Sequence, residues 1–460
     1  MKRTIFREFS IRGDAQVDLP DEVVTQIGRG IGTYFLTTAL ESAHPLKVVL
    51  GRDVRLSSGR ISRALTAGLL STGVGVIDIG LLPTPVLNFA VDHFQAYGGI
   101  MITASHNPPG DNGFKLRTDV TLTGAALQEI YDLTAGGSFI QGMGKQETQD
   151  GLSPYLAALE QRAVSGSAKR IVIDGGNGIN GRVVSDFLTG LGHEVIELFT
   201  EPDGRFPNRN PDPTAPEALL AAGQAVLARG ADFGLAYDGD GDRVALIDET
   251  GRPHYGDIIL MLLARQALLQ GPIQVVHDVS CTQALADDVA AHGGQAYPAA
   301  VGYAFVHAKM RVVGATLGGE SAGHIFCLDH QFKFDDAILA GLKLLNYFVL
   351  QTEPVSALIA DLPGYYTSPN LRIFCPDELK GELVATIRDH YQATHPLDTT
   401  DGAKVFFARG WVLLRQSNTQ PAISLRAEGE TAEIMEAIKA EVMTLVAEEL
   451  AKRGVAKSGK

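Results

Sequence analysis

Cysteine is scarce in this sequence, and long apolar runs are absent. The 460 residues include three cysteines, Cys281, Cys327 and Cys375, which are widely spaced and form no CxxC pair. This usage argues against a disulfide framework or a zinc site and favours a reducing compartment. The longest apolar stretch, residues 258–264, is far shorter than the roughly 20 residues that a membrane span needs. The first residues, MKRTIFREFSIRGD, lack the apolar segment of a signal peptide, so a cytoplasmic protein is expected.

Positively charged residues are also fewer than negatively charged ones, 39 against 53. The formal net charge is −14, and no long basic run occurs, which argues against nucleic acid or an anionic membrane as a partner. A local cluster of arginine and lysine could still bind a small anion. The P-loop pattern GxxxxGK[ST] occurs nowhere, so a bound phosphate would belong to a phosphate ester rather than to a nucleotide held by that motif.

The sequence contains an internal repeat. Three stretches, beginning at Val48, Ile171 and Ile273, each start with an apolar run that ends in a polar loop carrying aspartate. Each continues with a segment of helical period, a glycine and a second apolar run. This pattern predicts three strand–helix–strand units, and their spacing of about 100–120 residues fits three α/β domains of ordinary size.

The last hundred residues follow another plan. The pattern predicts a helix over 377–391, a hairpin through Arg409–Gly410, a further strand, AISLRAE, and a closing amphipathic helix over 431–453. The sequence therefore predicts an α/β protein: three similar α/β domains with mixed sheets, plus a C-terminal α+β domain, arranged around a central cleft. The expected domains are 1–150, 151–250, 251–362 and 363–460.

The stretch TASHNPPGDNGFK places a hydroxyl and an imidazole, Ser105 and His106, where an apolar run ends. The turn-forming residues 107–110 follow at once, because proline fixes φ and disfavours helix at the residue before it. A side chain at the mouth of a strand can reach a ligand. Taken alone, the stretch is more typical of a surface turn that happens to carry serine and histidine.

The stretch DGDGDR brings Asp238, Asp240 and Asp242 together between two apolar runs. Clustered carboxylates are unfavourable unless a cation compensates them, and hard oxygen ligands select Mg²⁺ or Ca²⁺. An EF-hand is excluded, because Arg243 occupies the position that requires glycine and the flanks are strand-like. The remaining alternative is a solvated acidic turn. Mg²⁺ keeps positions open for phosphate oxygens, and Arg243 could pair with the same phosphate.

Two further loops carry polar groups suited to a sugar phosphate. GGESAGH holds a carboxylate that can accept two hydroxyl hydrogen bonds, Glu320, and an imidazole, His324. RQSNTQP offers a guanidinium, hydroxyls and an amide for a phosphate: Arg415, Ser417, Asn418 and Thr419. In isolation each is equally well explained as an ordinary loop. Positive charge around a phosphate could also come from Arg7, Arg12 and Lys115, with Arg52 and Arg55 in addition.

Together these motifs resemble the α-D-phosphohexomutase family, and in particular its bacterial phosphomannomutase/phosphoglucomutase branch. The resemblance spans essentially the whole chain in family order, through IFREFSIRGD, GRDVRLSS, TASHNP, NGFK, DGGNG, DGRFPNRNPDP, DGDGDR, GGESAGH and RQSNTQP. It implies that Ser105 is carried as phosphoserine and that Mg²⁺ is bound by Ser105, Asp238, Asp240 and Asp242.

The resemblance also implies roles for the remaining polar residues. The transferring group would be surrounded by Arg12, His106, Lys115 and Arg243, of which Lys115 and Arg12 are candidates for assisting proton transfer. Substrate would be contacted by Arg7, Tyr303, Glu320, Ser321, His324, Arg415, Ser417, Asn418 and Thr419.

The implied activity is a phosphohexose mutase that interconverts 1-phospho and 6-phospho sugars, of glucose, mannose or both, through a bisphosphorylated intermediate that also serves as activator. A phosphoglucosamine or phosphopentose mutase, a phosphatase or phosphotransferase using the same phosphoserine, and a binding protein without catalysis are the alternatives. The expected partner is a hexose phosphate, and the expected assembly is a monomer or small homo-oligomer. Departures from the family pattern at Phe9, Ser10, Ser280, Tyr303 and Ala322 leave the preferred sugar open.

Overall fold

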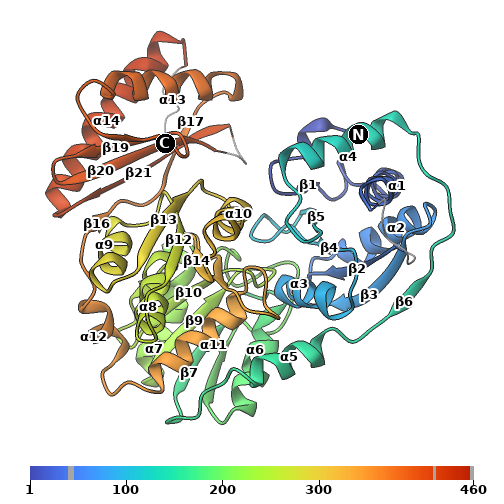
Figure 1. Ribbon diagram of the computed structural model, residues 1–460, viewed down its shortest axis with the longest axis horizontal. Coiled ribbons are helices and arrows are strands. Elements are labelled where there is room, and N and C mark those ends of the chain that lie inside the picture. The colour runs from blue at the N-terminus through green and yellow to red at the C-terminus, as the bar shows by residue number, and fades with distance from the viewer. Residues whose placement is uncertain (40–45, 418–420, 456–460) are drawn as a thin grey trace. The chain divides into compact units, whose positions relative to one another are not determined.

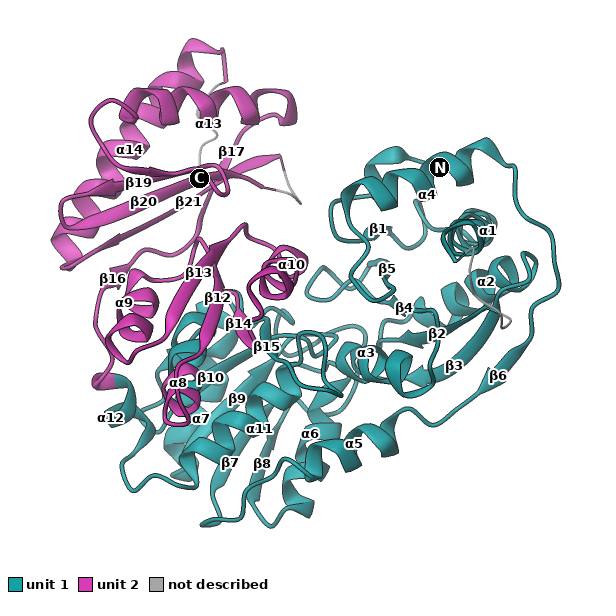
Figure 2. Ribbon diagram, in the orientation of Figure 1, with its two compact units in different colours: residues 1–263, 322–359 teal, residues 264–321, 360–460 magenta. Residues whose placement is uncertain are grey.

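The computed structural model describes residues 1–39, 46–417 and 421–455. The chain divides into two compact units (Figure 2). The first unit comprises Met1–Leu263 and Ala322–Ile359, and the second comprises Ala264–Ser321 and Ala360–Lys460.

The first unit begins with a mixed sheet whose strand order is β1-β5-β4-β2-β3-β6 (Figure 1). Its central strands are parallel, whereas β4 pairs with β5, and β5 with β1, in antiparallel orientation. Its strands are β1 (Ile11–Asp14), β2 (Lys47–Arg52), β3 (Gly75–Leu81), β4 (Gly98–Ile102), β5 (Asp111–Arg117) and β6 (Gln146–Thr148). All five residues of β4 are buried, as expected of a central strand covered on both faces.

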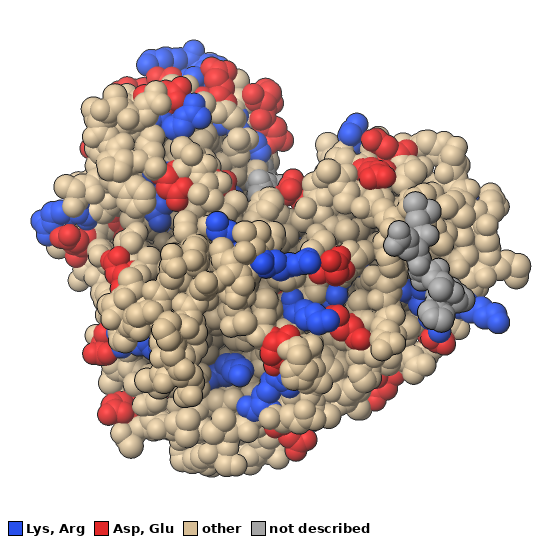
Figure 3. Space-filling model, viewed as in Figure 1, with Lys and Arg blue, Asp and Glu red and all other residues tan. Residues whose placement is uncertain are grey.

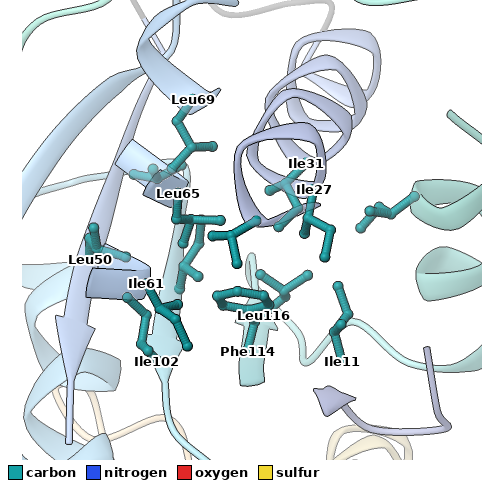
Figure 4. Close-up of a cluster of buried hydrophobic side chains, with 14 of the residues drawn as sticks. Ile11, Ile27, Ile31, Leu50, Ile61, Leu65, Leu69, Ile102, Phe114 and Leu116 are labelled. Atoms are coloured by element: carbon teal, nitrogen blue, oxygen red, sulfur yellow. The ribbon is translucent and has the colours of Figure 1, made fainter. Parts of the chain in front are cut away.

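Helices of this region bury apolar side chains in the interior of the first unit. They are η1 (Arg3–Ile5), α1 (Asp21–Thr38), α2 (Ser58–Leu70), α3 (Thr84–His93), α4 (Gly124–Gly136) and α5 (Leu152–Glu160). In the core, Ile27 and Ile31 of α1 and Leu65 of α2 meet sheet residues such as Phe114 (Figure 4). Burial of such side chains stabilises a fold by roughly 1.5–3 kcal/mol each.

A second mixed sheet, of order β11-β10-β9-β7-β8, completes the first unit. β7 pairs in parallel with β8 and β9, and β10 pairs antiparallel with β9 and β11. The strands are β7 (Arg170–Asp174), β8 (Glu194–Leu198), β9 (Phe233–Tyr237), β10 (Val244–Asp248) and β11 (Pro253–His254). The accompanying elements are α6 (Asn180–Gly190), η2 (Pro216–Leu219), α7 (Leu220–Arg229), β15 (Ile325–Cys327) and α11 (Ala337–Phe348). Helices α8 (Gly256–Leu268) and α12 (Val355–Ala360) each run across a boundary between the units.

The second unit holds two further sheets. In one, β12 (Gln274–Asp278) pairs in parallel with β13 (Gln295–Ala299) and with β14 (Leu317–Gly319). Its helices are α9 (Gln283–Ala291) and α10 (Tyr303–Val313).

The other sheet of the second unit is antiparallel. Its order is β16-β21-β20-β19-β18, with β17 also paired to β21. The elements are β16 (Tyr366–Thr367), β17 (Leu371–Phe374), α13 (Asp377–Tyr391), β18 (Leu397–Asp398), β19 (Ala403–Phe407), β20 (Gly410–Gln416), β21 (Ala422–Gly429) and α14 (Ala432–Lys452). The two helices bury their apolar side chains against the sheet in one core.

The predicted fold class is confirmed. Each of the three repeated stretches forms a strand, a helix and a parallel strand: β2-α2-β3, β7-α6-β8 and β12-α9-β13. The predicted helix over 377–391 coincides with α13, and the predicted hairpin is formed by β19 and β20. The closing helix begins after Thr431, whose hydroxyl accepts a hydrogen bond from the N–H of Ile434.

Two surface properties are relevant to partners. None of the helices in the described part of the chain combines the length and the apolar character required of a membrane span. On the face shown in Figure 3, lysine and arginine side chains lie interspersed with aspartate and glutamate side chains.

Candidate active site

The residues singled out in the sequence follow the carboxyl ends of parallel strands. Ser105 lies three residues after β4, Asp238 comes directly after β9, and Glu320 comes directly after β14. In an α/β sheet this edge is where ligands bind, because the loops there converge and the backbone is accessible. Each of the three α/β sheets therefore carries one of these loops after a strand that pairs in parallel with the first strand of a repeat.

Ser105 lies in a constrained turn. Its φ is +49°, in the left-handed region that side-chain-bearing residues seldom adopt. Its N–H donates to the Thr103 hydroxyl at 2.8 Å, and its own hydroxyl donates to Asp238 Oδ2 at 2.7 Å. The Nδ1 atom of His106 lies 3.3 Å from the same hydroxyl. The turn thus presents Ser105 to the acidic loop, and its strained backbone is maintained by the surrounding contacts.

The three aspartates of DGDGDR converge, as predicted. One oxygen of each of Asp238, Asp240 and Asp242 lies within 4.8 Å of the others, and all three side chains are buried. Asp238 Oδ1 accepts the main-chain N–H groups of Gly241, Asp242 and Arg243 at 2.9–3.2 Å. The residues form a tight turn between β9 and β10. The glycine at position 241, with a φ of +78°, permits this turn.

The electrostatics of this group favour a cation. Burial and the neighbouring Asp242 and Asp240 carboxylates raise the pKa of Asp238 well above its usual range. Burial acts in the same direction on Asp240, but the Lys115 ammonium together with hydrogen bonds from Asp238 and Thr84 outweighs it, so the pKa of that carboxyl is lowered. Lys115 Nζ lies 2.7 Å from Asp240 Oδ2 and also contacts Asp242. A single ammonium thus compensates part of the negative charge of three buried carboxyl groups.

A divalent cation fits the oxygen atoms that remain. Among the described residues, Asp240 Oδ1 and Asp242 Oδ1 are buried and accept no hydrogen bond. Buried carboxylate oxygens without a partner are costly, and a hard cation coordinated by oxygen atoms removes that cost. The donor set of three carboxylates and a serine oxygen suits Mg²⁺.

The groups predicted to surround the transferring phosphoryl gather around His106. Burial lowers the pKa of this imidazole well below its usual value, and the charges of Arg243 and Arg12 add to that effect. The Asp240 carboxylate acts to raise the pKa of His106, and the Lys115 ammonium acts to lower it. The Nη1 atom of Arg12 donates to the Asn107 side chain at 3.0 Å, which connects β1 to the Ser105 turn.

His324 lies beside Arg243 and the acidic turn. The two residues form a β-bridge, and Arg243 Nε donates to His324 Nε2 at 2.9 Å. The other ring nitrogen, Nδ1, lies 2.7 Å from Asp335 Oδ2. The imidazole therefore accepts at Nε2 and donates at Nδ1, which fixes its tautomer and orientation.

Two arginines were suggested as additional positive charge for a phosphate, Arg52 and Arg55. Arg52 pairs with Asp78. The side chain of Arg55 has no exposed surface, and its guanidinium donates to carbonyl oxygens inside the fold. For Arg55 the expectation was wrong, because sequence spacing cannot tell an outward guanidinium from one that satisfies buried carbonyl groups. The charge of Arg7 acts on Asp18, where it contributes after Lys2 to a lowered pKa.

The sugar-facing residues predicted in the second unit lie around Asp278 and Gly302. Glu320 Oε1 accepts the N–H of Gly302 at 2.7 Å, and Tyr303 opens α10 directly after that glycine. The N–H of Ser321 donates to Asp278 Oδ2 at 3.0 Å. Glu320 is 4% exposed and one of its oxygens is already engaged, which restricts how a ligand could approach it.

The predicted phosphate loop follows β20. Arg415 lies 3.8 Å from Asp401, and the main-chain oxygen of Ser417 accepts a hydrogen bond from Lys380 Nζ at 2.8 Å. Asn418 and Thr419 lie outside the described residues. Sequence reasoning missed Lys380, because it lies on α13, far from the motif in the chain.

Thr84 is another residue that the motifs did not indicate. Its hydroxyl and its N–H donate to the Oδ2 and the main-chain oxygen of Asp240, both at 2.8 Å. The only signal in the sequence is a Pro-Thr-Pro segment that opens α3, and this segment is equally typical of any helix start.

Comparison with known proteins accounts for this arrangement. Four family models match in order: the α/β/α domains I, II and III of phosphoglucomutase/phosphomannomutase over residues 3–141, 153–251 and 255–366, and the C-terminal domain over 371–445. A phosphomannomutase/phosphoglucomutase of Pseudomonas aeruginosa is 35% identical over 95% of this chain and 94% of its own. The chain belongs to the phosphoglucomutase/phosphomannomutase family.

Other relatives agree with this membership. A phosphoglucomutase of Neisseria gonorrhoeae is 35% identical over 95% of each chain. The crystal structure of a phosphoglucomutase/phosphomannomutase family protein from Burkholderia thailandensis is 33% identical, with a TM-score of 0.90 over 96% of this chain and 97% of its own. The fold is shared with an Aspergillus fumigatus N-acetylphosphoglucosamine mutase solved with GlcNAc-6P and magnesium, at 16% identity and a TM-score of 0.62.

Membership of the family determines the class of chemistry. The chain is an enzyme of the isomerase class that moves phosphoryl groups, and the phosphoserine mechanism is typical of the family. The family is magnesium-dependent, and the acidic turn of this chain has the composition and burial of a metal site.

Proposed function

We propose that this enzyme interconverts the 1-phospho and 6-phospho forms of a hexose, glucose or mannose, with Ser105 as the phosphoryl carrier. One observation carries the proposal. The Ser105 hydroxyl is held 2.7 Å from Asp238, in a group of three buried aspartates whose remaining oxygens include two without a hydrogen-bond partner among the described residues. A hydroxyl fixed beside a cation site is the arrangement that a phosphoserine donor requires.

The carboxylates of Asp238, Asp240 and Asp242, with an oxygen of the Ser105 phosphoryl group, would hold Mg²⁺. The ion supplies charge neutralisation for the phosphoryl oxygens during transfer. Lys115 contacts two of the three carboxylates and would remain beside the same oxygens as a fixed positive charge.

In the transfer step, the bond between phosphorus and Ser105 Oγ breaks while a bond forms between phosphorus and the free hydroxyl of the sugar phosphate. The sugar hydroxyl loses its proton, and the serine oxygen leaves as an anion that takes up a proton. Arg12, Arg243 and His106 would surround the moving group and stabilise its charge. Lys115 and Arg12 are the candidates for assisting the movement of the proton.

The second half of the reaction reverses the first with the other phosphate. The hexose bisphosphate turns over and returns its second phosphoryl group to Ser105, so the bisphosphate also serves as activator. Tyr303, Glu320, Ser321 and His324 would contact the sugar, and Arg7 is a further candidate for binding the substrate. The phosphate that is not being transferred would be bound by Arg415, Ser417, Asn418 and Thr419.

A coupled assay with glucose 1-phosphate and mannose 1-phosphate, with and without a trace of the hexose bisphosphate, tests this function. We expect formation of the 6-phosphates, stimulation by the bisphosphate, and mass-spectrometric detection of phosphate on Ser105. The Ser105→Ala variant should lose turnover by at least about 10³-fold, because the group that carries the phosphoryl is gone. Ser153→Ala, which removes an exposed hydroxyl from α5 of the same unit, is the matched control and should keep full activity.

Two results would contradict the proposal. Near-normal isomerisation by Ser105→Ala would remove this residue from the carrier role. Release of inorganic phosphate without isomerisation would identify a phosphatase instead.

A further inference from the structure

The internal repeat places an aspartate at the same position in each of its three units. Asp53 comes directly after β2, whereas Asp174 and Asp278 are the last residues of β7 and β12. These strands pair in parallel with β4, β9 and β14, respectively. The three neighbours lead into the turn that carries Ser105, the acidic turn that begins at Asp238, and the loop that begins at Glu320. A strand-end aspartate thus lies beside each functional loop.

In the first repeat the aspartate holds an arginine against the Ser105 turn. Asp53 pairs with Arg55 at 3.2 Å, and neither side chain has exposed surface. The Arg55 Nη2 atom donates to the carbonyl oxygens of Ser105 and Asn107, and Nη1 donates to those of Pro108 and Asp111, at 2.6–2.8 Å. One guanidinium therefore fixes four carbonyl groups of the turn in which Ser105 has its left-handed backbone.

In the second repeat an aspartate and an arginine hold the acidic turn in a corresponding way. Arg209 Nε lies 3.0 Å from both oxygens of Asp174, and its Nη2 donates to the carbonyl of Tyr237 at 2.7 Å. That carbonyl is part of the peptide bond between Tyr237 and Asp238. Both side chains are again buried, with Arg209 9% exposed.

The two clamped segments contact each other. A Cβ atom added at Gly239 would lie 2.6 Å from the carbonyl oxygen of Ser105, the same oxygen that accepts a hydrogen bond from Arg55 Nη2. The distance between the serine and the acidic turn is therefore set by a carbonyl with a fixed position. In the third repeat Asp278 bonds the N–H of Ser321 without an intervening arginine.

We propose that Arg55 and Arg209 are positioning residues, which hold from inside the fold the main chain of the phosphoryl-carrying turn and of the metal-binding turn, respectively. Only the expected effect on kcat rests on the proposed function. A planar guanidinium with five N–H donors can serve a carboxylate and several carbonyl groups at once, whereas an ammonium has three donors and no planar fork. Lysine at either position keeps the charge and loses the geometry.

The test compares Arg55→Lys, Arg209→Lys and Arg117→Lys in the full chain. Arg117 is the matched control: it is a buried arginine of the first unit that pairs with Asp92 and donates to the carbonyl of Asn88, away from both turns. Three readouts are needed, namely amide hydrogen exchange by mass spectrometry, Mg²⁺ binding by calorimetry, and kcat and KM for the hexose phosphate.

We expect a crossed pattern. Arg55→Lys should speed exchange in residues 103–111 and lower kcat by about 10²-fold, the effect of a misplacement of about 1 Å. Its KM and Mg²⁺ affinity should stay within about threefold. Arg209→Lys should speed exchange in residues 237–243 and weaken Mg²⁺ binding by about 10- to 100-fold, as the loss of a group that orients metal ligands does. Arg117→Lys should leave both segments, Mg²⁺ binding and kcat unchanged.

The proposal is overturned if Arg55→Lys keeps kcat within twofold, or if either variant speeds exchange no more in its own turn than in the rest of the unit. Inactivity of the wild-type enzyme as a mutase would contradict the proposed function alone. The exchange and Mg²⁺ measurements would still decide whether the two arginines position their turns.

Discussion

Single buried carboxyl groups of this enzyme differ in what stabilises them. Asp238 accepts hydrogen bonds from three main-chain N–H groups, and Asp240 accepts hydrogen bonds from Lys115 and Thr84. Asp336, at the start of α11, accepts the N–H of Leu339 at 2.8 Å and the hydroxyl of Tyr155 at 3.0 Å. Burial dominates there and raises the pKa of Asp336 from 3.8 to about 7.

This pKa predicts how stability depends on pH. Folded Asp336 keeps its proton between about pH 4 and pH 7, where the unfolded chain has lost it. The native state then binds more protons, so this group favours folding at low pH, and its contribution is lost as the pH rises through about 7. Between pH 5 and pH 8 the expected loss is about 3 kcal/mol in the free energy of unfolding.

Asp336→Asn should abolish that part of the pH dependence, because the amide resembles the protonated acid and still accepts at the helix start. The measurement is urea unfolding at pH 5 and pH 8. Asp132→Asn, which alters an exposed carboxylate (65%), is the control. An unchanged pH dependence in Asp336→Asn would contradict the assignment.

At the scale of elements, close approach of α1 and α2 shapes the first domain. A Cβ atom at Gly68 of α2 would lie 2.3 Å from the carbonyl oxygen of Thr25 and 2.9 Å from the Cα of Gly28 in α1. Both contacts are with main chain, which cannot move aside as a flexible side chain can. The two helices can pack at this distance only because glycines face each other where they meet.

Gly68→Ala should therefore destabilise the protein by about 2 kcal/mol, although alanine is the better helix former. Gly59→Ala is the matched variant in the same helix, since the nearest atom to its new Cβ would be the end of Arg63 at 4.0 Å. It should be neutral or stabilising by up to about 1 kcal/mol. Equal midpoints of thermal unfolding for the two variants would refute the argument from close packing.

At the scale of the whole molecule, the two compact units carry different reporters. The acidic turn lies in the first unit, whereas Trp411, which is the single tryptophan of the chain, is buried in the second. Its indole N–H donates to Glu428 at 2.6 Å, and the Lys404 ammonium lies 3.9 Å from its ring centroid. Tryptophan fluorescence therefore reports the second unit, and far-ultraviolet circular dichroism reports both.

Mg²⁺ should stabilise the first unit by mass action, by about 2.7 kcal/mol when its concentration is 100 times the dissociation constant. The midpoint of part of the circular dichroism transition should rise, while the midpoint seen by tryptophan fluorescence stays unchanged. Mg²⁺ removal with EDTA should reverse the shift, and Asp240→Asn should abolish it. An equal shift in both signals would show that the two units unfold as one.

Much of the fold could be predicted because its patterns are local. The strand–helix–strand repeat, the hairpin of β19 and β20 and the closing helix follow from apolar period and turn residues, which act over a few residues. The convergence of Asp238, Asp240 and Asp242 was also predictable, since they are neighbours in the chain. The contacts of Lys115 with two of them join residues 125 and 127 positions apart, and no spacing rule reaches so far.

Sequence by itself determined the class of fold, the residue types of the site and, through its motifs, the family. The tertiary structure decided which way each charged side chain faces. Arg55 appeared to be one of several positive charges available to a phosphate, and folding turned it inward to hold the carbonyl groups of the Ser105 turn. The reason is physical: a buried carbonyl group must be satisfied by some donor, and which donor reaches it depends on strands that meet only when the sheet has formed.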